Sequence, residues 1–248
     1  MTFTEDVGDN MIVCVTMRYG SKRLPGKALI NFDGRNSVDI LKEQLCSSEN
    51  QVVFCCPHGP EGDPIVEYAE SIGLTCFRGS LENVLDRMVS AAEHYNSESF
   101  IRVTGDDLFI DPVYMDKLAA VHECSDADIS VSDLPKGTET IVIRTSFARG
   151  ILSSYGNNTE LWDRQRSDQW KDAKVELVPL SVVPVNEDTF ALELDTPEDY
   201  EVIKEVLSRL VDAGIEQPYF IEELVELHEC KRFPTSRDPV DRTYFSNA

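Results

Sequence analysis

The stretch from residue 11 to residue 27 reads MIVCVTMRYGSKRLPGK, an apolar run that passes directly into a basic loop. Residues 11–16 have the apolar, β-branched composition of a buried strand. Residues 18–27 carry four basic side chains and no acidic one, and Gly20 and Gly26 let the backbone approach a bound anion closely. A strand that ends in such a loop predicts an anion-binding site beyond its carboxyl end, with a solvated basic turn as the alternative.

Outside this stretch, short β-rich runs alternate with helical patterns. Further strands are predicted at residues 51–56, 74–77, 100–104, 129–132, 139–144 and 190–194. Helices are predicted at residues 37–46, 81–95, 112–123 and 219–227, and from the caps Asp63 and Thr196 onward. This alternation predicts an α/β fold in which a mostly parallel, twisted sheet carries helices on both faces. In such sheets ligands bind beyond the carboxyl ends of the strands.

The domain organisation expected from these patterns is simple. Residues 1–10 form an N-terminal tail, residues 11–212 a single α/β domain, and residues 213–248 a C-terminal tail with one helix. Within the domain, residues 153–174 are polar and show neither a helical nor a strand period. We interpret residues 153–185 as an excursion from the sheet and as a candidate region for acceptor binding or dimer contacts.

The charge balance excludes several classes of partner. Lys and Arg total 23 and Asp and Glu total 45, which gives a net charge of −22. A chain this acidic repels polyanions, so nucleic acid and membrane surfaces are not expected as partners. No apolar run approaches the ~18 residues of a membrane span, and the N-terminus is unlike a signal peptide. We therefore expect a cytoplasmic protein whose site for any anionic substrate is a local island of positive charge.

Two carboxylates stand directly after predicted strands. Asp106 follows residues 100–104 through Gly105, and Asp195 follows residues 190–194. Carboxylates in such positions can hold Mg²⁺ against phosphate oxygens, and two of them would complete one site. Position alone leaves an ordinary Gly-Asp turn as an equal alternative for Asp106. Asp111, which precedes Pro112, is instead interpreted as a helix cap.

Other catalytic motifs are missing from the sequence. The basic loop is not a Walker A loop, because five residues separate Gly20 from Gly26 and Ala28 stands where Ser or Thr is required. The chain contains no G-x-G-x-x-G and no G-x-S-x-G. The histidines form no metal-binding pattern, and the three on helices, His94, His122 and His228, are expected at the surface.

Residues 18–27 resemble the R-x-x-S-x-R-L-P-G-K loop of the cytidylyltransferases that make CMP-activated acidic sugars. This family includes the CMP-Kdo synthetases, the acylneuraminate cytidylyltransferases and the spore-coat polysaccharide biosynthesis proteins. Four further segments match in the family's order, at residues 66–80, 83–87, 102–112 and 195–199. The resemblance covers roughly residues 11–210, and the spore-coat branch is nearest through residues 77–80 and 83–87.

The resemblance implies a glycosyltransferase-A-like nucleotidyltransferase domain that transfers CMP from CTP to a small anionic acceptor, such as an acidic sugar, and releases pyrophosphate. It also implies a Mg²⁺ cofactor, a homodimer and a role in polysaccharide biosynthesis. The catalytic residues would be Lys27, Arg18, Asp106 and Asp195, with Asp106 and Asp195 as metal ligands. The nucleotide-binding residues would be Arg18, Gly20, Ser21, Lys22, Arg23, Lys27, Arg78 and Thr104. Glu139 falls where relatives place residues that face the acceptor.

Two kinds of alternative remain open from the sequence. On the same fold, the protein could be a nucleotidyltransferase that uses another base, or a glycosyltransferase. In another class, it could be a catalytically silent nucleotide-binding scaffold. The presence of the basic loop together with Lys27, Asp106 and Asp195 argues against the silent scaffold, because a degenerate relative is expected to lose at least one of them.

Overall fold

The fold is known from a computed structural model that describes residues 11–159, 168–179 and 190–230. Within these residues a seven-stranded sheet has the order β5-β4-β1-β6-β8-β7-β9. Its strands are β1 (Ile12–Thr16), β4 (Gln51–Pro57), β5 (Cys76–Gly79), β6 (Ser99–Thr104), β7 (Ile129–Ser132), β8 (Ile141–Arg144) and β9 (Val175–Val178). Strand β8 runs antiparallel to β6 and β7, and the other pairings are parallel. The predicted mostly parallel α/β sheet is confirmed.

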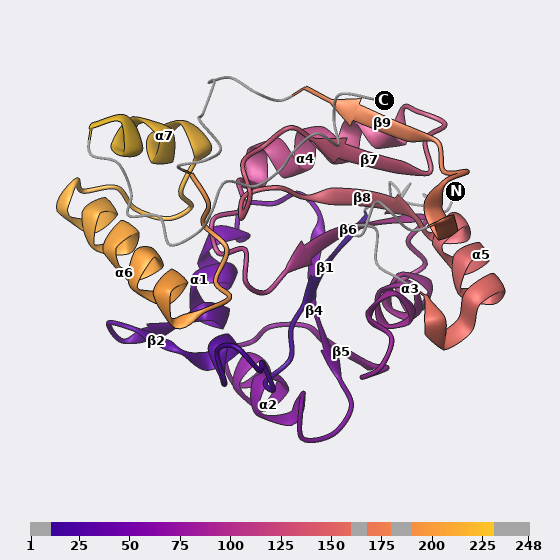
Figure 1. Ribbon diagram of the computed structural model, residues 1–248, viewed down its shortest axis with the longest axis horizontal. Helices are drawn as coiled ribbons and strands as arrows, with labels where there is room; N and C mark the ends of the chain where they lie inside the picture. The colour runs from indigo at the N-terminus through magenta and orange to yellow at the C-terminus, as the bar shows by residue number, and fades with distance from the viewer. Residues whose placement is uncertain (1–10, 160–167, 180–189, 231–248) are drawn as a thin grey trace, which may run out of the picture.

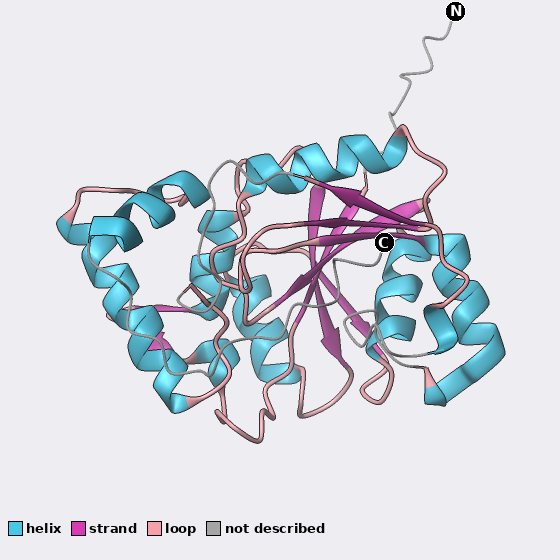
Figure 2. Cartoon of the chain, turned by 45° about the horizontal axis from the view of Figure 1, so that its top comes forward, coloured by secondary structure: helices cyan, strands magenta, loops and turns pink. Residues whose placement is uncertain are grey.

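Helices cover both faces of this sheet (Figure 2). They are α1 (Ser37–Gln44), α2 (Asp63–Ser71), α3 (Val84–His94), α4 (Pro112–Glu123), α5 (Thr145–Tyr155), α6 (Pro197–Asp212) and α7 (Ile221–Cys230). A small hairpin, β2 (Asn31–Phe32) and β3 (Arg35–Asn36), precedes α1. Figure 1 shows α3 and α5 side by side at one end of the molecule and α6 and α7 together at the other. No helix in the described part of the chain is long and apolar enough to span a membrane.

Strand β1 shows how the sequence builds two cores around one sheet. Val13 and Val15 point into the larger core, which α1, α2, α4, α6 and α7 complete. Ile12 and Cys14 point to the opposite face and pack with residues of α3 and α5. Successive side chains of a strand face opposite sides, so an uninterrupted apolar run is what a central strand with two covered faces requires.

Helix caps define where two of the helices begin. The side chain of Asp111 accepts hydrogen bonds from the backbone N–H groups of Val113 and Tyr114, as predicted. Thr196 and Asp199 form the predicted capping box at the start of α6. The prediction for Asp63 is wrong: Gly62 occupies the cap position, and the Asp63 carboxylate pairs instead with Arg78.

Several segments differ from the sequence-based prediction. Residues 190–194 do not form a strand of the sheet, and a single bridge joins Glu193 to Asp107. Strand β9 lies inside the expected excursion but pairs with β7 and extends the sheet. Strand β5 begins two residues later than predicted, and helix α5 and the small hairpin were not predicted. The expected N-terminal tail and parts of the expected excursion and C-terminal tail lie outside the described residues.

The prediction that the helical histidines lie at the surface holds for His94 but is wrong for His228 in α7 and for His122 in α4, which are both buried. The Nδ1 of His122 lies 2.8 Å from the Ser130 hydroxyl of β7, and its Nε2 lies 3.1 Å from the Ser99 hydroxyl of β6. Two hydroxyls can satisfy a neutral imidazole, whereas the charged form would donate both ring N–H groups to uncharged hydroxyls in a buried place. Burial and then the charge of Arg144 lower the pKa of His122 to about 4.

This lowered pKa predicts a loss of stability in mild acid. In the unfolded chain the pKa of His122 is near 6.5, so between about pH 6.5 and pH 4 the unfolded state binds a proton that the folded state does not. The free energy of unfolding should therefore decrease as the pH falls through this window, by about 2–3 kcal/mol from this residue. Denaturant unfolding of the wild type and His122→Gln at pH 7 and pH 4 measures the contribution. Equal losses in the two proteins would contradict it.

Candidate active site

The candidate active site lies where neighbouring parallel strands end. Strands β1 and β6 are adjacent, with Thr16 beside Thr104, so the chain leaves both at the same edge of the sheet. The Gly105 N–H donates to the Thr16 carbonyl at 3.0 Å. A Cβ at Gly105 would lie 2.3 Å from the Met17 side chain, so this close approach requires glycine.

The basic loop (residues 18–27) folds back on itself. The Tyr19 carbonyl accepts hydrogen bonds from the N–H groups of Ser21 (3.0 Å) and Gly26 (3.2 Å). Gly26 has a φ of +71°, a conformation that favours glycine, and a 3₁₀ turn (Lys27–Leu29) follows it. The turn places Lys27 across from the carboxylates that follow β6 and precede α6.

Lys27 joins the two predicted metal ligands. Its ammonium donates to Asp106 Oδ2 at 2.6 Å, to Asp195 Oδ1 at 2.9 Å and to the Leu194 carbonyl at 3.1 Å. Arg23 donates to the other carboxylate oxygen of Asp195 at 2.6 Å. The structure therefore brings together four of the predicted site residues from three separate parts of the chain.

The protonation of Lys27 follows from these contacts. Burial acts to lower the pKa of the ammonium, but the charges and hydrogen bonds of Asp106 and Asp195 outweigh it, and the pKa is raised above its usual value. Lys27 is therefore a cation at neutral pH, held between two carboxylates with little exposure of its side chain.

Glu193 adds a third carboxylate that the sequence analysis missed. One oxygen from each of Asp106, Glu193 and Asp195 lies within 4.8 Å of the others, and we call these residues the acidic triad. Glu193 also pairs with Lys136 at 2.6 Å. The signal was present in the sequence, because residues 193 and 195 of an extended segment point to the same side.

Backbone contacts hold residues 192–195 against the end of β6. The N–H of Leu194 donates to the Asp106 carbonyl at 2.9 Å, and the N–H of Leu192 donates to the Lys136 carbonyl at 3.0 Å. Gly137 has a φ of +88°, and a Cβ there would lie 2.5 Å from the backbone of Leu192. Glycine at 137 is thus what allows two carboxylates of the acidic triad to reach the third.

A fourth carboxyl, Asp107, is buried beside the acidic triad. Thr104 donates a hydrogen bond to it, and Thr104 is one of the predicted nucleotide-binding residues. Burial, followed by the charges of Asp106 and Glu139, raises the pKa of Asp107 well above its usual range. This environment favours the uncharged form of Asp107. The Glu139 carboxylate accepts from the Gly137 N–H at 2.6 Å.

The remaining predicted residues lie along the same edge but contact other groups. The Gly20 N–H donates to the Glu61 carboxylate at 2.7 Å, so an acidic side chain already occupies one donor of the basic loop. Arg78, at the end of β5 and two strands from β1, pairs with Asp63 at 2.5 Å. Among the described residues, Arg18 and Lys22 form no ion pair, and both are exposed.

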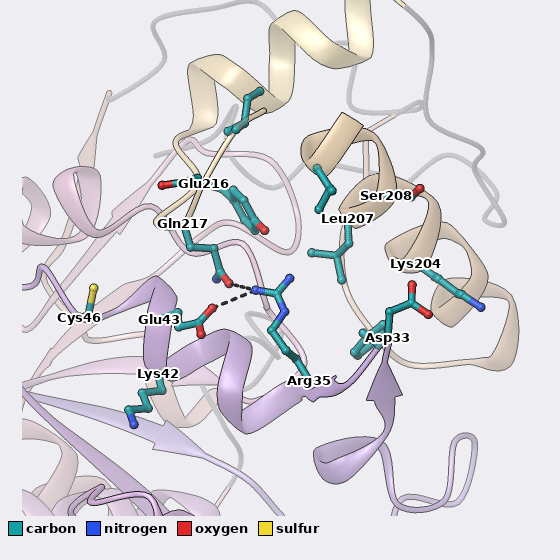
Figure 3. A pocket seen from close by; sticks show the side chains of 14 residues that line it. Asp33, Arg35, Lys42, Glu43, Cys46, Lys204, Leu207, Ser208, Glu216 and Gln217 are labelled. Carbon is teal, nitrogen blue, oxygen red and sulfur yellow. Dashed lines mark hydrogen bonds and ion pairs between the residues drawn. The ribbon is translucent and has the colours of Figure 1, made fainter. Parts of the chain in front are cut away.

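A cavity of about 710 Å³ lies apart from this edge, between the small hairpin, α1 and α6 (Figure 3). Arg35 crosses it and donates to Glu43 at 2.9 Å and to Gln217 at 2.6 Å. The cavity is lined by no residue of the basic loop and none of the acidic triad. We therefore assign the candidate active site to the edge of the sheet where β1 and β6 end, and not to this cavity.

Comparison with known proteins agrees with the site geometry. The model of the cytidylyltransferase family matches residues 12–233, which is most of the chain. The chain belongs to the cytidylyltransferase family. This family member is thus a nucleotidyltransferase, and the resemblance found in the basic loop is confirmed.

The chain is also similar in sequence to individual proteins of this family. The spore coat polysaccharide biosynthesis protein SpsF of Bacillus subtilis is 28% identical over 232 residues, which cover 88% of this chain and 94% of SpsF. The 3-deoxy-manno-octulosonate cytidylyltransferase of Yersinia pseudotuberculosis is 24% identical over 174 residues, covering 66% and 68% of the two chains. The chain is therefore related both to the spore-coat protein SpsF and to the 3-deoxy-manno-octulosonate cytidylyltransferases.

Solved structures share the fold. A cytidylyltransferase from Leptospira borgpetersenii superposes with a TM-score of 0.76 at 22% identity, over 89% of this chain and 93% of its own. The CMP:2-keto-3-deoxy-manno-octonic acid synthetase complexed with CTP gives a TM-score of 0.62 at 13% identity, over 81% and 99% of the chains. The predicted nucleotidyltransferase fold is confirmed.

Proposed function

We propose that this protein is a Mg²⁺-dependent cytidylyltransferase that transfers CMP from CTP to a small anionic acceptor, such as an acidic sugar, in surface polysaccharide biosynthesis. The observation that carries the proposal is the contact of Lys27 with Asp106 and Asp195 at the end of the basic loop. A concentration of cations beside a cluster of carboxylates is what a metal-bound triphosphate requires.

The acidic triad fits a Mg²⁺ ion. Mg²⁺ prefers oxygen ligands, and the triad offers three carboxylates whose oxygens lie within 4.8 Å of one another. The Lys27 ammonium contacts three oxygens at 2.6–3.1 Å, which supports a place for a cation there. We assign Asp106 and Asp195 as ligands, with Glu193 as the third. Bound there, Mg²⁺ would neutralise phosphate charge and orient the phosphate oxygens.

The chain's own residues would bind and position the triphosphate. Arg18, Lys22, Arg23 and Lys27 supply the positive charge. Gly20 and Ser21 are assigned to the same site, where the Gly20 N–H would exchange the Glu61 carboxylate for a phosphate oxygen. Lys27 and Arg18 are assigned to the contacts that strengthen as charge develops at the α-phosphate. An acceptor oxygen would form the new bond to the α-phosphorus while the bond to the β-phosphate oxygen breaks and releases pyrophosphate. Positioning and charge neutralisation suffice, so no protein nucleophile is needed.

The other assignments rest on position along the same edge of the sheet. Arg78 and Thr104 are proposed to contact the nucleotide, and Glu139 is proposed to face the acceptor. We further propose that the protein is cytoplasmic and forms a homodimer. Each chain would consist of one nucleotidyltransferase domain, residues 11–212, followed by a C-terminal tail.

An acceptor screen tests the proposed activity. Pyrophosphate release is measured with CTP, Mg²⁺ and a panel of acidic sugars, against neutral sugars and against EDTA. Release that needs Mg²⁺ and an acidic sugar is expected, with a CMP-sugar as the second product. Release that depends on a neutral sugar would contradict the acceptor class, and transfer of a sugar from a nucleotide sugar would favour a glycosyltransferase.

A further inference from the structure

We propose that Lys27 is an internal competitor of the metal, so that the free protein binds a divalent cation weakly and gains affinity for it only when a nucleoside triphosphate draws Lys27 away. This inference deepens the proposed function, because it concerns the order in which the two ligands occupy the same site. It goes beyond the assignment of Lys27 to the triphosphate, since it gives the residue a second role before any ligand arrives.

The contacts of Lys27 are those of a bound cation. Its Nζ lies within 2.6–3.1 Å of three oxygens, from Asp106, Asp195 and the backbone of Leu194. Asp106 and Asp195 are two of the three residues whose oxygens could converge on a metal ion. An ammonium and a divalent cation cannot both occupy the space between these carboxylates. Metal binding therefore requires the Lys27 side chain to move out.

Two other cationic side chains also contact carboxylates of the acidic triad. Asp195 accepts from Arg23 at 2.6 Å as well as from Lys27, and Glu193 pairs with Lys136 at 2.6 Å. Three cationic side chains thus contact three carboxylates. The Arg23 side chain is 67% exposed, whereas that of Lys27 is 16% exposed. Because solvent screens exposed pairs more strongly, Lys27 is the competitor that matters most.

A triphosphate gives Lys27 a new partner of higher charge. If the ammonium turns to the phosphates, the carboxylates of Asp106 and Asp195 become available at the moment when phosphate oxygens supply further metal ligands. Nucleotide and metal then favour each other's binding, and the coupling is reciprocal. A free divalent cation gains no such help and must displace Lys27 unaided.

The first test measures metal binding without nucleotide. Mn²⁺ is the probe, because it takes the same oxygen ligands and its free form can be counted by electron paramagnetic resonance. Lys27→Ala should bind Mn²⁺ between about 5-fold and 150-fold more tightly than the wild type, the usual range for coupled sites. The matched control is Lys22→Ala, which removes the same charge from the same loop without touching the acidic triad. It should change Mn²⁺ affinity by less than about 2-fold.

A second measurement uses the unaltered protein and so does not depend on the variant's folding. Amine acetylation followed by mass spectrometry reports how readily each lysine reacts. Adding Mn²⁺ should increase the labelling rate of Lys27, because the displaced ammonium is more accessible, and should leave Lys42 on α1 unchanged. Slower or unchanged labelling of Lys27 at saturating Mn²⁺ would overturn the proposal, as would equal Mn²⁺ affinity of Lys27→Ala and the wild type.

These outcomes are distinguishable from a failure of the proposed function. If Lys27 does not compete with the metal but the wild type still releases pyrophosphate from CTP, only this inference is wrong. If Mn²⁺ binds tightly to Lys27→Ala and displaces Lys27 in the wild type, yet no nucleotide binds, the competition between Lys27 and the metal stands, whereas its relief by a triphosphate and the proposed transferase activity are both wrong.

Discussion

Replacing Asp195 with Asn should reduce Mg²⁺-dependent turnover by at least about a thousandfold while the protein remains folded. The substitution keeps the shape of the side chain but removes the negative charge that Lys27 and Arg23 contact. It also leaves the start of α6 intact, because the Asp195 backbone N–H, not its side chain, donates to Asp199. The variant thus removes a proposed metal ligand without removing a helix cap.

Pyrophosphate release measures the loss, and circular dichroism with thermal unfolding checks the fold. The control is Asp33→Asn, an exposed aspartate in the turn between β2 and β3 that lies outside the acidic triad. Its turnover should equal that of the wild type. Near-normal activity of Asp195→Asn would remove Asp195 from the metal site and leave the predicted two-aspartate site without support.

Replacing Lys27 with Ala should lower kcat/KM by roughly a hundredfold, which corresponds to about 3 kcal/mol of transition-state stabilisation. The 3₁₀ turn that Lys27 begins fixes its backbone beside the end of the basic loop, so the ammonium, once it leaves Asp106, can turn to the α-phosphate. If the contact strengthens as charge develops there, kcat should fall together with kcat/KM.

Steady-state kinetics at saturating Mg²⁺ separate the alternatives for Lys27. A rise in KM at unchanged kcat would show that Lys27 binds the ground state and the transition state equally, against a catalytic role. Lys42→Ala is the matched control, because Lys42 is an exposed lysine on α1 that donates to the Ile72 carbonyl. Its kcat and KM should not change.

The parts of the site that could be predicted from sequence are those that follow neighbouring parallel strands. The apolar run of β1 identified a central strand, and the same edge of the sheet had to carry the loops after β1 and β6. Lys27 and Asp106 were therefore expected at the same edge, and their direct contact follows from the adjacency of β1 and β6, which only the structure shows. Asp195 was predicted at this edge because residues 190–194 looked like a strand; no strand of the sheet forms there, and it is the hydrogen bond from the Leu194 N–H to the Asp106 carbonyl that brings Asp195 to the site.

The parts that could not be predicted depend on contacts between irregular segments. The pairing of Glu193 with Lys136 arises because residues 136 and 192 share a backbone hydrogen bond, a contact with no periodic signal. The extended segment 190–194 looked like a strand because Phe190, Leu192 and Leu194 alternate, yet their burial comes from packing in the larger core. His122 looked exposed because a lone histidine on a helix usually is, whereas the hydroxyls of Ser99 and Ser130 give it buried partners.

The central claim is that the basic loop and the acidic triad together bind a metal-bound cytidine triphosphate. The most direct test is thermal unfolding with each of CTP, ATP, GTP and UTP, with and without Mg²⁺, which needs no acceptor. At 100 times its dissociation constant, CTP with Mg²⁺ should stabilise the fold by about 2.7 kcal/mol, and the other nucleotides should do so less. Stronger stabilisation by another nucleotide would overturn the cytidylyl assignment, and no shift with any of the four would contradict a nucleotide site and favour a silent scaffold.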